Sequence, residues 1–397
     1  MRDGEDPPVV AHVPMAFSPQ ASTLMTVVQR LGDAYREDLG GTSYAVLSDN
    51  RGVSVESLGQ VYVDYTRACP RQWFTRRELG VDVVAGGIGR PRPHYGRLYD
   101  PAIEAVAERG ADVVLLYEGH YASASLPRWR EALPDAELCL YVHNPLSRTY
   151  RRRELSRLLR AADRVVFCAD HLREDVRRRT GGALTDRLEV VHNGVGAPFV
   201  TNARRTAPQD AFVVLFVGRV AEHKGVHLVL DAAEQAAAKL ERPVVVEVAG
   251  SADYGGGTGD SAYSARLRER AAHMSVSVRW LGWLDEGALA AKMHGAGAAC
   301  LPSLWAEGLP TAALQSLAMG TPVVCSDSAG MVEAVGDAGL VCKNASVDEL
   351  ARALVTLASD DALWLRTSEL SRQQAAQFSW TRASAMLAGI ASEPGEA

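Results

Sequence analysis

Lysine is scarce in this chain of 397 residues: only four of its 42 basic residues are lysines, and the others are arginines. The 48 acidic residues outnumber the basic ones and give a formal net charge of −6, which argues against a nucleic-acid-binding protein. No Asp-x-Asp sequence occurs, so the paired carboxylates that could bridge a divalent cation to a phosphate are missing. We therefore expect neither a nucleic-acid partner nor a bound metal.

Paired cysteines and long apolar runs are missing as well. None of the six cysteines belongs to a Cys-x-x-Cys pair, and four lie in apolar, strand-like runs, which predicts buried thiols in a reducing compartment. The acidic start Met1–Pro8 does not have the basic-then-apolar order of a signal peptide. The charge-free run Gly308–Ser326 contains prolines and a further glycine, so it does not predict a transmembrane helix. These absences predict a cytoplasmic protein.

Short apolar runs alternate with helical periodicities along the chain, a pattern typical of α/β domains with buried parallel sheets. The turn-rich segment 193–208 separates two such series and reads as a linker. Each series predicts one doubly wound, Rossmann-like domain, whose ligands would lie at the carboxyl ends of the strands. The expected strands are Val9–Pro14, Tyr44–Leu47, Val61–Val63, Val113–Tyr117, Leu138–Val142, Val165–Cys168 and Leu188–Val191, then Phe212–Val217, Val244–Ala249, Val278–Leu281, Ala298–Leu301 and Pro322–Cys325.

The segment Gly218–Gly225 follows one of these strands and precedes a helix. It places Arg219 and Lys224 in a turn before a helix N-terminus, where cations and free N–H groups suit a diphosphate. Spacing alone favours equally a solvated turn whose cations pair with Glu222 or Asp231.

A second segment, Leu301–Pro322, brackets a short helix with its own start and stop residues. Pro310 fits the first position of the helix, and Gly320 fits the position just after its C-terminus. Glu307 precedes the positive end of this helix, where its carboxylate would cap the helix or reach a sugar hydroxyl. Gln315 lies inside the helix.

Taken together, these segments resemble the donor-site signature of the family 4 retaining glycosyltransferases. The resemblance rests on Gly218-Arg219-x4-Lys224-Gly225 and on Pro302-Ser303-x3-Glu307-Gly308-x6-Gln315-x4-Gly320-Thr321-Pro322. It extends to His143, to Val191-His192-Asn193-Gly194-Val195 and to Phe378-Ser379-Trp380. It implies the GT-B fold, with an acceptor-binding domain over residues 1–198, a nucleotide-sugar-binding domain over 199–377, and a C-terminal helix in 378–397 that packs back on the first domain.

The resemblance also implies roles for individual residues. Arg219 and Lys224 would hold the diphosphate and neutralise the leaving group, Glu307 would contact hydroxyls of the donor sugar, and His143 would lie near the reacting carbon. A lone histidine after a strand is otherwise most often structural. The remaining expected donor contacts are Gly218, Gly250, Ser251, Trp283, Leu284, Gly308, Leu309, Pro310, Thr311 and Gln315.

Two positions depart from the family pattern. Gln315 stands where the family usually has a second glutamate that holds the ribose hydroxyls, and Met15–Ala21 stands where the family has a glycine-rich loop. The expected acceptor contacts are Gln20, Glu118 and His120, with an ordinary solvated loop as the equal alternative for the last two.

The expected reaction moves a sugar from a nucleoside diphosphate sugar, with a UDP-sugar slightly favoured, to an acceptor hydroxyl without a metal. Front-face attack is preferred to a double displacement. A double displacement needs a carboxylate on the far side of the sugar, and Glu118 would be that carboxylate. The acceptor stays open among a small molecule, a saccharide and a lipid-linked compound. Two rival functions are a non-catalytic nucleotide-sugar sensor and, remotely, a nicotinamide dehydrogenase, for which the chain lacks the glycine fingerprint.

Residues 148–187 hold 12 arginines against six acidic residues. We expect a solvated helix face there in preference to a membrane-binding face.

Overall fold

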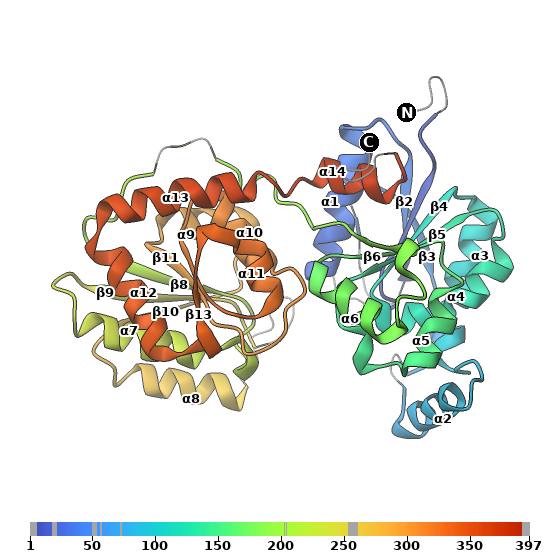
Figure 1. Ribbon diagram of the computed structural model, residues 1–397, viewed down its shortest axis with the longest axis horizontal. Coiled ribbons are helices and arrows are strands. Elements are labelled where there is room, and N and C mark those ends of the chain that lie inside the picture. The colour runs from blue at the N-terminus through green and yellow to red at the C-terminus, as the bar shows by residue number, and fades with distance from the viewer. Residues whose placement is uncertain are drawn as a thin grey trace. The chain divides into compact units, whose positions relative to one another are not determined.

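The computed structural model describes residues 6–17, 22–49, 54–55, 58–71, 74–201, 203, 205–252 and 261–390. The chain divides into two compact units (Figure 1). Unit 1 comprises the chain up to Asn193 together with the segment from Trp380, and unit 2 is Gly194–Ser379. Each unit is an α/β domain around one parallel sheet, so the predicted fold class, two Rossmann-like domains of the GT-B type, is confirmed.

Unit 1 contains a seven-stranded sheet in the order β3-β2-β1-β4-β5-β6-β7, with every neighbouring pair parallel. Because the order reverses between β1 and β4, the loops after these two strands open apart and leave room for a ligand. The strands are β1 (Val10–Val13), β2 (Ser43–Ser48), β3 (Gly59–Val63), β4 (Val113–Tyr117), β5 (Glu137–Val142), β6 (Arg164–Phe167) and β7 (Leu188–Val190).

The helices of unit 1 connect these strands, and one comes from the far end of the chain. They are α1 (Thr23–Glu37), α2 (Arg76–Gly87), α3 (Asp100–Arg109), α4 (Gly119–Ala132), α5 (Arg152–Leu159), α6 (Asp170–Thr180) and α14 (Trp380–Leu387). The last helix packs against α1, where Ser384 Oγ donates to Leu31 O at 3.0 Å. Arg164 Nη2 also donates to Met386 O at 2.7 Å, so α14 is tied to β6 as well.

Unit 2 repeats the plan with six parallel strands in the order β10-β9-β8-β11-β12-β13. The strands are β8 (Phe212–Val217), β9 (Val244–Ala249), β10 (Ser277–Gly282), β11 (Ala298–Leu301), β12 (Val323–Ser326) and β13 (Gly339–Cys342). The helices are α7 (Val226–Ala237), α8 (Ala262–Ala271), α9 (Glu286–Gly295), α10 (Thr311–Ala318), α11 (Ala329–Val335), α12 (Val347–Ser359) and α13 (Asp361–Ala375).

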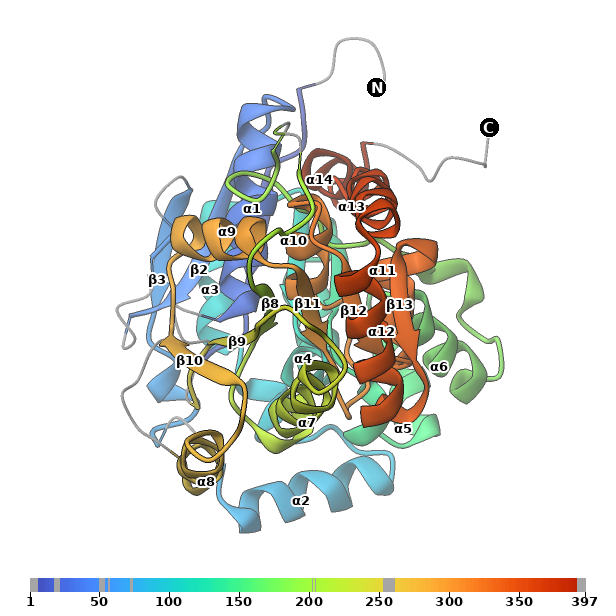
Figure 2. The same cartoon turned by 90° about the vertical axis from the view of Figure 1, so that its left-hand side faces the viewer.

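Alternation along β8 divides the core of unit 2 between two faces. Phe212, Val214 and Phe216 pack with residues of α7 and α12, whereas Leu215 packs with residues of α9. Figure 2 shows these three helices around β8. A strand that is buried on both faces reads as a continuous apolar run, which is why Phe212–Val217 could be recognised in the sequence.

Two local features differ from the expectations. Strand β13 was not expected. Pro310 is the residue before α10 and not its first helical residue, since its φ of −72° and ψ of 111° are extended.

All six cysteines are buried and free of disulfide bonds. No helix among the described residues combines the length and the apolar character needed to cross a bilayer.

His12 on β1 is 1% exposed, and its Nδ1 lies 2.7 Å from the hydroxyl of Tyr117 on β4. Burial lowers the pKa of His12 to about 3. Because the unfolded chain binds this proton near pH 6.5 and the folded chain does not, stability falls as the pH drops below 6.5. We expect His12 to reduce the free energy of unfolding by about 2 kcal/mol between pH 7 and pH 5.

Urea unfolding at a series of pH values checks this prediction. His12→Gln should flatten the acid side of the profile, and His273→Gln, which replaces an exposed histidine of unit 2, serves as the matched control. An unchanged acid slope in His12→Gln would contradict the prediction.

Candidate functional site

Two loops of unit 2 meet where the strand order reverses. The first follows β8 and runs from Gly218 to Gly225, and the second follows the neighbouring strand β11 and contains Pro302–Gly308. Leu304 N donates to His223 O at 2.8 Å, which joins the loops directly. Gly225 has φ 76°, and a Cβ there would lie 2.3 Å from Pro302 O, so only glycine allows this close approach.

Lys224 and Glu307 form an ion pair across these loops. The Nζ of Lys224 lies 2.6 Å from Oε1 of Glu307, and the side chains are 25% and 14% exposed. Ser303 Oγ donates to the same oxygen at 2.6 Å and fixes the carboxylate from a second direction. Glu307 therefore pairs with the lysine of the first loop and makes no side-chain cap on α10. Because both side chains are partly exposed, a polar ligand could contact the cation and the anion of this pair.

Arg219 lies beside the same pair. Its Nη2 is 3.3 Å from Nε2 of His223. Burial, followed by the cationic charges of Arg219 and Lys224, lowers the pKa of His223, and Glu307 acts in the opposite direction. The imidazole is therefore neutral at pH 7, and Arg219, Lys224 and Glu307 are all near enough to act on it electrostatically. The positive charges that the sequence predicts at one place are found together.

Glycines hold the ends of β8, β9 and β10 in register. Gly218 N donates to Ala249 O at 3.0 Å, and Gly250 N donates to Gly282 O at 2.7 Å. A Cβ on Gly250, whose φ is 148°, would lie 1.8 Å from Gly218 O. Val220 N also donates to Ser251 O at 2.9 Å. These contacts place Ser251 next to the arginine-containing loop.

The residues after β10 differ in exposure. Trp283 is 55% exposed, a large value for a tryptophan, and Leu284 is partly buried. Because the main chain at Gly282 bonds to Gly250, this exposed ring comes from the strand end next to β9.

The N-terminus of α10 follows directly after Glu307. Leu309 is buried, Pro310 and Thr311 are partly buried, and no side chain caps the helix. A Cβ on Gly330 of α11 would lie 1.6 Å from Gly308 O, so α11 packs directly against the loop. Gln315 is partly buried on α10. The backbone N–H groups of Gly308, Leu309 and Thr311 thus lie at the positive end of the helix dipole, whereas Pro310 has no N–H.

Unit 1 has a separate polar cluster at the carboxyl ends of β4 and β5. Glu118 is 6% exposed and adopts φ 69° and ψ 118°, a backbone conformation that is strained for a residue with a side chain. Its Oε1 accepts from His120 N at 3.0 Å, and its Oε2 accepts from Asn144 Nδ2 at 2.6 Å. The carboxylate is therefore held at the start of α4 by two donors.

His143 follows β5 and packs among aromatic side chains. Its ring stacks on Tyr117 at 6.3 Å and meets the edge of Tyr141 at 4.3 Å, both measured between ring centroids. Its Nε2 lies 3.4 Å from Oδ1 of Asn193, which also accepts from the hydroxyl of Tyr141 at 2.9 Å. Burial lowers the pKa of His143, and the carboxylate of Glu118 opposes the shift. A neutral imidazole at pH 7 follows.

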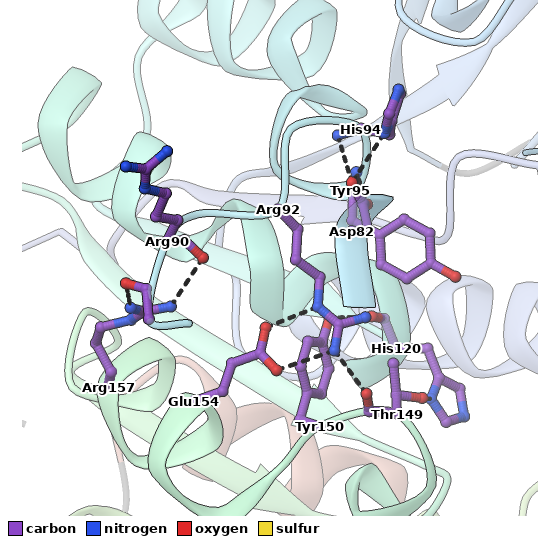
Figure 3. Close-up of polar contacts among 11 residues, drawn as sticks. Asp82, Arg90, Arg92, His94, Tyr95, His120, Thr149, Tyr150, Glu154 and Arg157 are labelled. Atoms are coloured by element: carbon purple, nitrogen blue, oxygen red, sulfur yellow. Dashed lines mark hydrogen bonds and ion pairs between the residues drawn. The ribbon is translucent and has the colours of Figure 1, made fainter. Parts of the chain in front are cut away.

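A third group of contacts connects this cluster to Arg92 and Glu154 (Figure 3). His120 Nδ1 is hydrogen-bonded to Oγ1 of Thr149, and Arg92 Nη2 donates to Thr149 O at 2.7 Å. Arg92 in turn forms a buried pair with Glu154, with its Nε 2.7 Å from Oε1. His120 is thus fixed by the same segment that anchors Arg92.

Three residues in these clusters received no individual role from the sequence: Ser303, Asn144 and Asn193. Ser303 and Asn193 stand inside the motifs that carry the family resemblance, and Asn144 directly follows His143, so the sequence contained a signal for them. Gln20 lies outside the described residues. Among the residues that the structure describes, no group of three or more His, Cys, Asp or Glu side chains is placed to hold a metal ion.

Two family models match adjacent parts of the chain. Glycosyltransferase Family 4 matches residues 51–197, and Glycosyl transferases group 1 matches residues 201–375. Together they span most of both units, and the chain belongs to the family 4 glycosyltransferases.

Curated proteins also match this chain in sequence. Glycogen synthase of Mycobacterium tuberculosis is 30% identical over 60% of this chain, and the aligned region spans 56% of that enzyme. The phosphatidyl-myo-inositol mannosyltransferase of Mycolicibacterium smegmatis is 26% identical over 77% of this chain and 79% of its own length. The chain therefore covers little more than half of some of the relatives it matches.

Solved structures share the fold. Anabaena Alr3699/HepE in complex with UDP matches with a TM-score of 0.71 and 15% identity, covering 96% of this chain and 98% of the other. Sucrose-phosphate synthase from Thermosynechococcus elongatus matches with a TM-score of 0.70 and 16% identity, with the same two coverages.

The strained backbone at Glu118 gives a testable contrast between two substitutions that both remove the carboxylate. Glu118→Gly relieves the positive φ, whereas Glu118→Ala keeps the strain. Glycine is normally the less stable choice by about 0.4–1 kcal/mol. Here we expect Glu118→Gly to be more stable than Glu118→Ala by about 1–3 kcal/mol in urea unfolding. Equal stability, or the ordinary order, would show that this conformation carries no strain.

Proposed function

We propose that this protein is a retaining, metal-independent glycosyltransferase that moves a sugar from a nucleoside diphosphate sugar to an acceptor hydroxyl. The observation that carries the proposal is the Lys224–Glu307 pair at the strand reversal of unit 2, with Arg219 beside it. Ligands of doubly wound sheets bind at such a reversal.

The two cations would hold the diphosphate. A departing nucleoside diphosphate gains negative charge in the transition state, and a cation about 4 Å away contributes up to ~4 kcal/mol at an effective dielectric constant of about 20. The N-terminus of α10 adds about 0.3–1 kcal/mol. Because the cations give the larger effect, Arg219 and Lys224 perform the electrostatic task that a metal performs in other transferases.

Glu307 would change partner when the donor binds. In the structure its carboxylate accepts from Lys224 and Ser303. Once the diphosphate takes Lys224, one carboxylate oxygen becomes available to the hydroxyls of the donor sugar. The same side chain thus keeps the lysine oriented before binding and selects the sugar afterwards.

The rest of the donor would lie along the strand ends of unit 2. We assign the base to the surroundings of Gly250, Ser251, Trp283 and Leu284. The phosphates would contact Gly218, the N–H groups of Gly308, Leu309 and Thr311, and the ring of Pro310, and the ribose hydroxyls would bind Gln315. A UDP-sugar is the favoured donor, and the Anabaena protein of the same fold is described in complex with UDP-glucose.

The acceptor would bind to unit 1. Hydrogen bonds within unit 1 fix Glu118 and His120, and neutral His143 can accept or donate one hydrogen bond. In front-face attack the acceptor oxygen bonds to the anomeric carbon while the bond from that carbon to the phosphate oxygen breaks. The leaving phosphate oxygen takes the acceptor proton, so no enzyme carboxylate is needed as nucleophile.

Loss of either cation should remove most of the catalysis. We expect Lys224→Ala or Arg219→Ala to lower kcat/KM roughly 100-fold to 1000-fold. This corresponds to a loss of about 2.7–4 kcal/mol of transition-state stabilisation. Sugar release from a panel of nucleoside diphosphate sugars, with water or added acceptors, measures this. Lys239→Ala, at an exposed lysine of the same unit, is the matched control.

Near-normal turnover in Lys224→Ala and Arg219→Ala would overturn the phosphate assignment. Tight donor binding by the natural protein without any turnover across donor and acceptor panels would favour the sensor. Binding of NAD in place of nucleotide sugars would favour a dehydrogenase.

The amide of Gln315 should bind the ribose hydroxyls more weakly than a carboxylate at this position would. A carboxylate accepts stronger hydrogen bonds from hydroxyls than an amide does. We expect Gln315→Glu to tighten UDP binding by about 1 kcal/mol, close to fivefold in Kd, when calorimetry compares it with the natural protein. The control Gln377→Glu adds the same charge at an exposed position of unit 2. Equal tightening in both variants, or none in either, would remove Gln315 from the ribose site.

A further inference from the structure

A groove of about 550 Å³ runs beside helix α13 of unit 2, which is the long red helix in Figure 1. Small-molecule sites have volumes of roughly 300–1,000 Å³, so the groove is large enough for a metabolite. One wall is the segment 205–209, which precedes β8, and the other is one face of α13. The lining residues of α13 are Asp361, Leu365, Ser368, Glu369 and Arg372. We call this space the α13 groove.

The α13 groove lies at the opposite edge of the sheet from the candidate donor site. Arg205 Nη2 donates to Ala296 O at 2.9 Å, just before β11 begins. Its Nη1 donates to Met319 O and to Thr321 Oγ1, both at 3.0 Å, just before β12 begins. The loops of the lysine–glutamate pair instead follow β8 and β11. Because all the strands are parallel, the two sites occupy opposite ends of the strands.

Arg205 brings an uncompensated positive charge to the α13 groove. Its three hydrogen bonds go to neutral oxygens and use three of the five N–H groups of an arginine, and it forms no ion pair with any described residue. Its guanidinium carbon lies 5.0 Å from the ring centroid of the buried Trp364, so the group is held in place. Burial, followed by the charge of Arg372, lowers the pKa of Arg205 to about 10. A bound anion would therefore stabilise this cation.

Arg372 packs beside Arg205. A Cβ on Gly320 would lie 3.3 Å from Nη1 of Arg372 and 3.4 Å from Cγ of Arg205, so both side chains contact the same glycine. Nη1 of Arg372 is buried without a hydrogen-bond partner among the described residues, which is costly for a charged group. Its Nη2 pairs with Glu369, whose side chain is 51% exposed, and such a pair contributes little net stability. An anion with several oxygens could therefore bond to both arginines.

The other end of the α13 groove carries groups that suit hydroxyls. Gln209 Nε2 donates to Oδ2 of Asp361 at 3.3 Å, and both residues are exposed. Asp361 forms no ion pair within the part of the chain that the structure describes, so its carboxylate is free to accept hydrogen bonds from a ligand. Leu365, which is 44% exposed, lies between Asp361 and Arg372 on the same face of α13 and offers an apolar contact.

We propose that the α13 groove binds a phosphorylated sugar, with its phosphate at Arg205 and Arg372 and its hydroxyls at Asp361 and Gln209. A phosphate carries about two negative charges and three oxygen acceptors, so it can bond to two guanidinium groups at once. A carboxylate has fewer oxygens and one charge and matches the arginines less well. A polyanion is disfavoured because Asp361 would repel its further charges. The inference uses unit 2 alone and does not depend on the proposed sugar transfer.

Isothermal titration calorimetry of the full chain tests this proposal, with glucose-6-phosphate as the probe. We expect binding both without UDP and with saturating UDP, because the candidate donor site lies at the other edge of the sheet. Glucose, inorganic phosphate and glucuronate should each bind at least roughly tenfold more weakly, since each lacks either the phosphate or the hydroxyls.

Two matched pairs of variants locate the probe. Arg372→Gln should weaken glucose-6-phosphate binding roughly tenfold, whereas Arg366→Gln, at an exposed arginine of α13 that does not line the groove, should leave it unchanged. Thr206 is an exposed lining residue of the other wall. Thr206→Glu should weaken binding by repelling the phosphate, and Thr206→Gln, which has the same size without the charge, should not. Unchanged melting temperatures establish that the variants fold, and the Thr206 pair suffices if Arg372→Gln does not.

Three results would overturn the proposal. The first is no binding of glucose-6-phosphate, or binding no tighter than that of inorganic phosphate or glucuronate. The second is full binding by Arg372→Gln and Thr206→Glu, which would place the probe elsewhere on the chain. The third is binding that UDP or Lys224→Ala abolishes, since the probe would then occupy the candidate donor site. None of these results bears on turnover, so the proposed function is tested separately.

Discussion

The ion pair between Lys224 and Glu307 is the interaction on which the account of this protein depends. It joins loops that are 83 residues apart in sequence and that follow neighbouring strands of one sheet. Neither partner is deeply buried, and Ser303 supports the carboxylate. A pair in this position is strong enough to keep both side chains in place without a ligand. It is also exposed enough to exchange, because a partly solvated pair contributes little net stability. We therefore propose that a bound anion rearranges this pair.

Unit 1 uses its polar groups differently. Glu118 and Asp82 are almost fully buried carboxylates, and each is held by two or more donors from its own unit. Such groups are costly to leave unpaired, so they fix the backbone around them. At Glu118 the result is a strained turn at the head of α4, and at Asp82 it is a helix whose valines face outward. The carboxylates of unit 1 are buried and fix the backbone, whereas the ion pair of unit 2 is partly exposed and can exchange partners.

Much of the fold could be predicted because the central strands are buried on both faces and read as apolar runs. Phe212–Val217 and Val113–Tyr117 are found where their sequences place them. Strand β13 escaped notice because it is short, lies at the sheet edge and is buried only at Cys342. The motifs singled out Lys224 and Glu307 and included Ser303 and Asn193, but the contacts of Asn144 with Glu118 and of Asn193 with His143 join segments 26 and 50 residues apart, which no local pattern predicts.

The most direct test of the central claim is a crystal structure of the protein with UDP bound, read at Lys224 Nζ. The account predicts that Nζ leaves Oε1 of Glu307 and lies about 2.7–2.9 Å from an oxygen of the diphosphate, with Arg219 on the same group. A bound diphosphate elsewhere on the chain, with the Lys224–Glu307 pair intact, would contradict it.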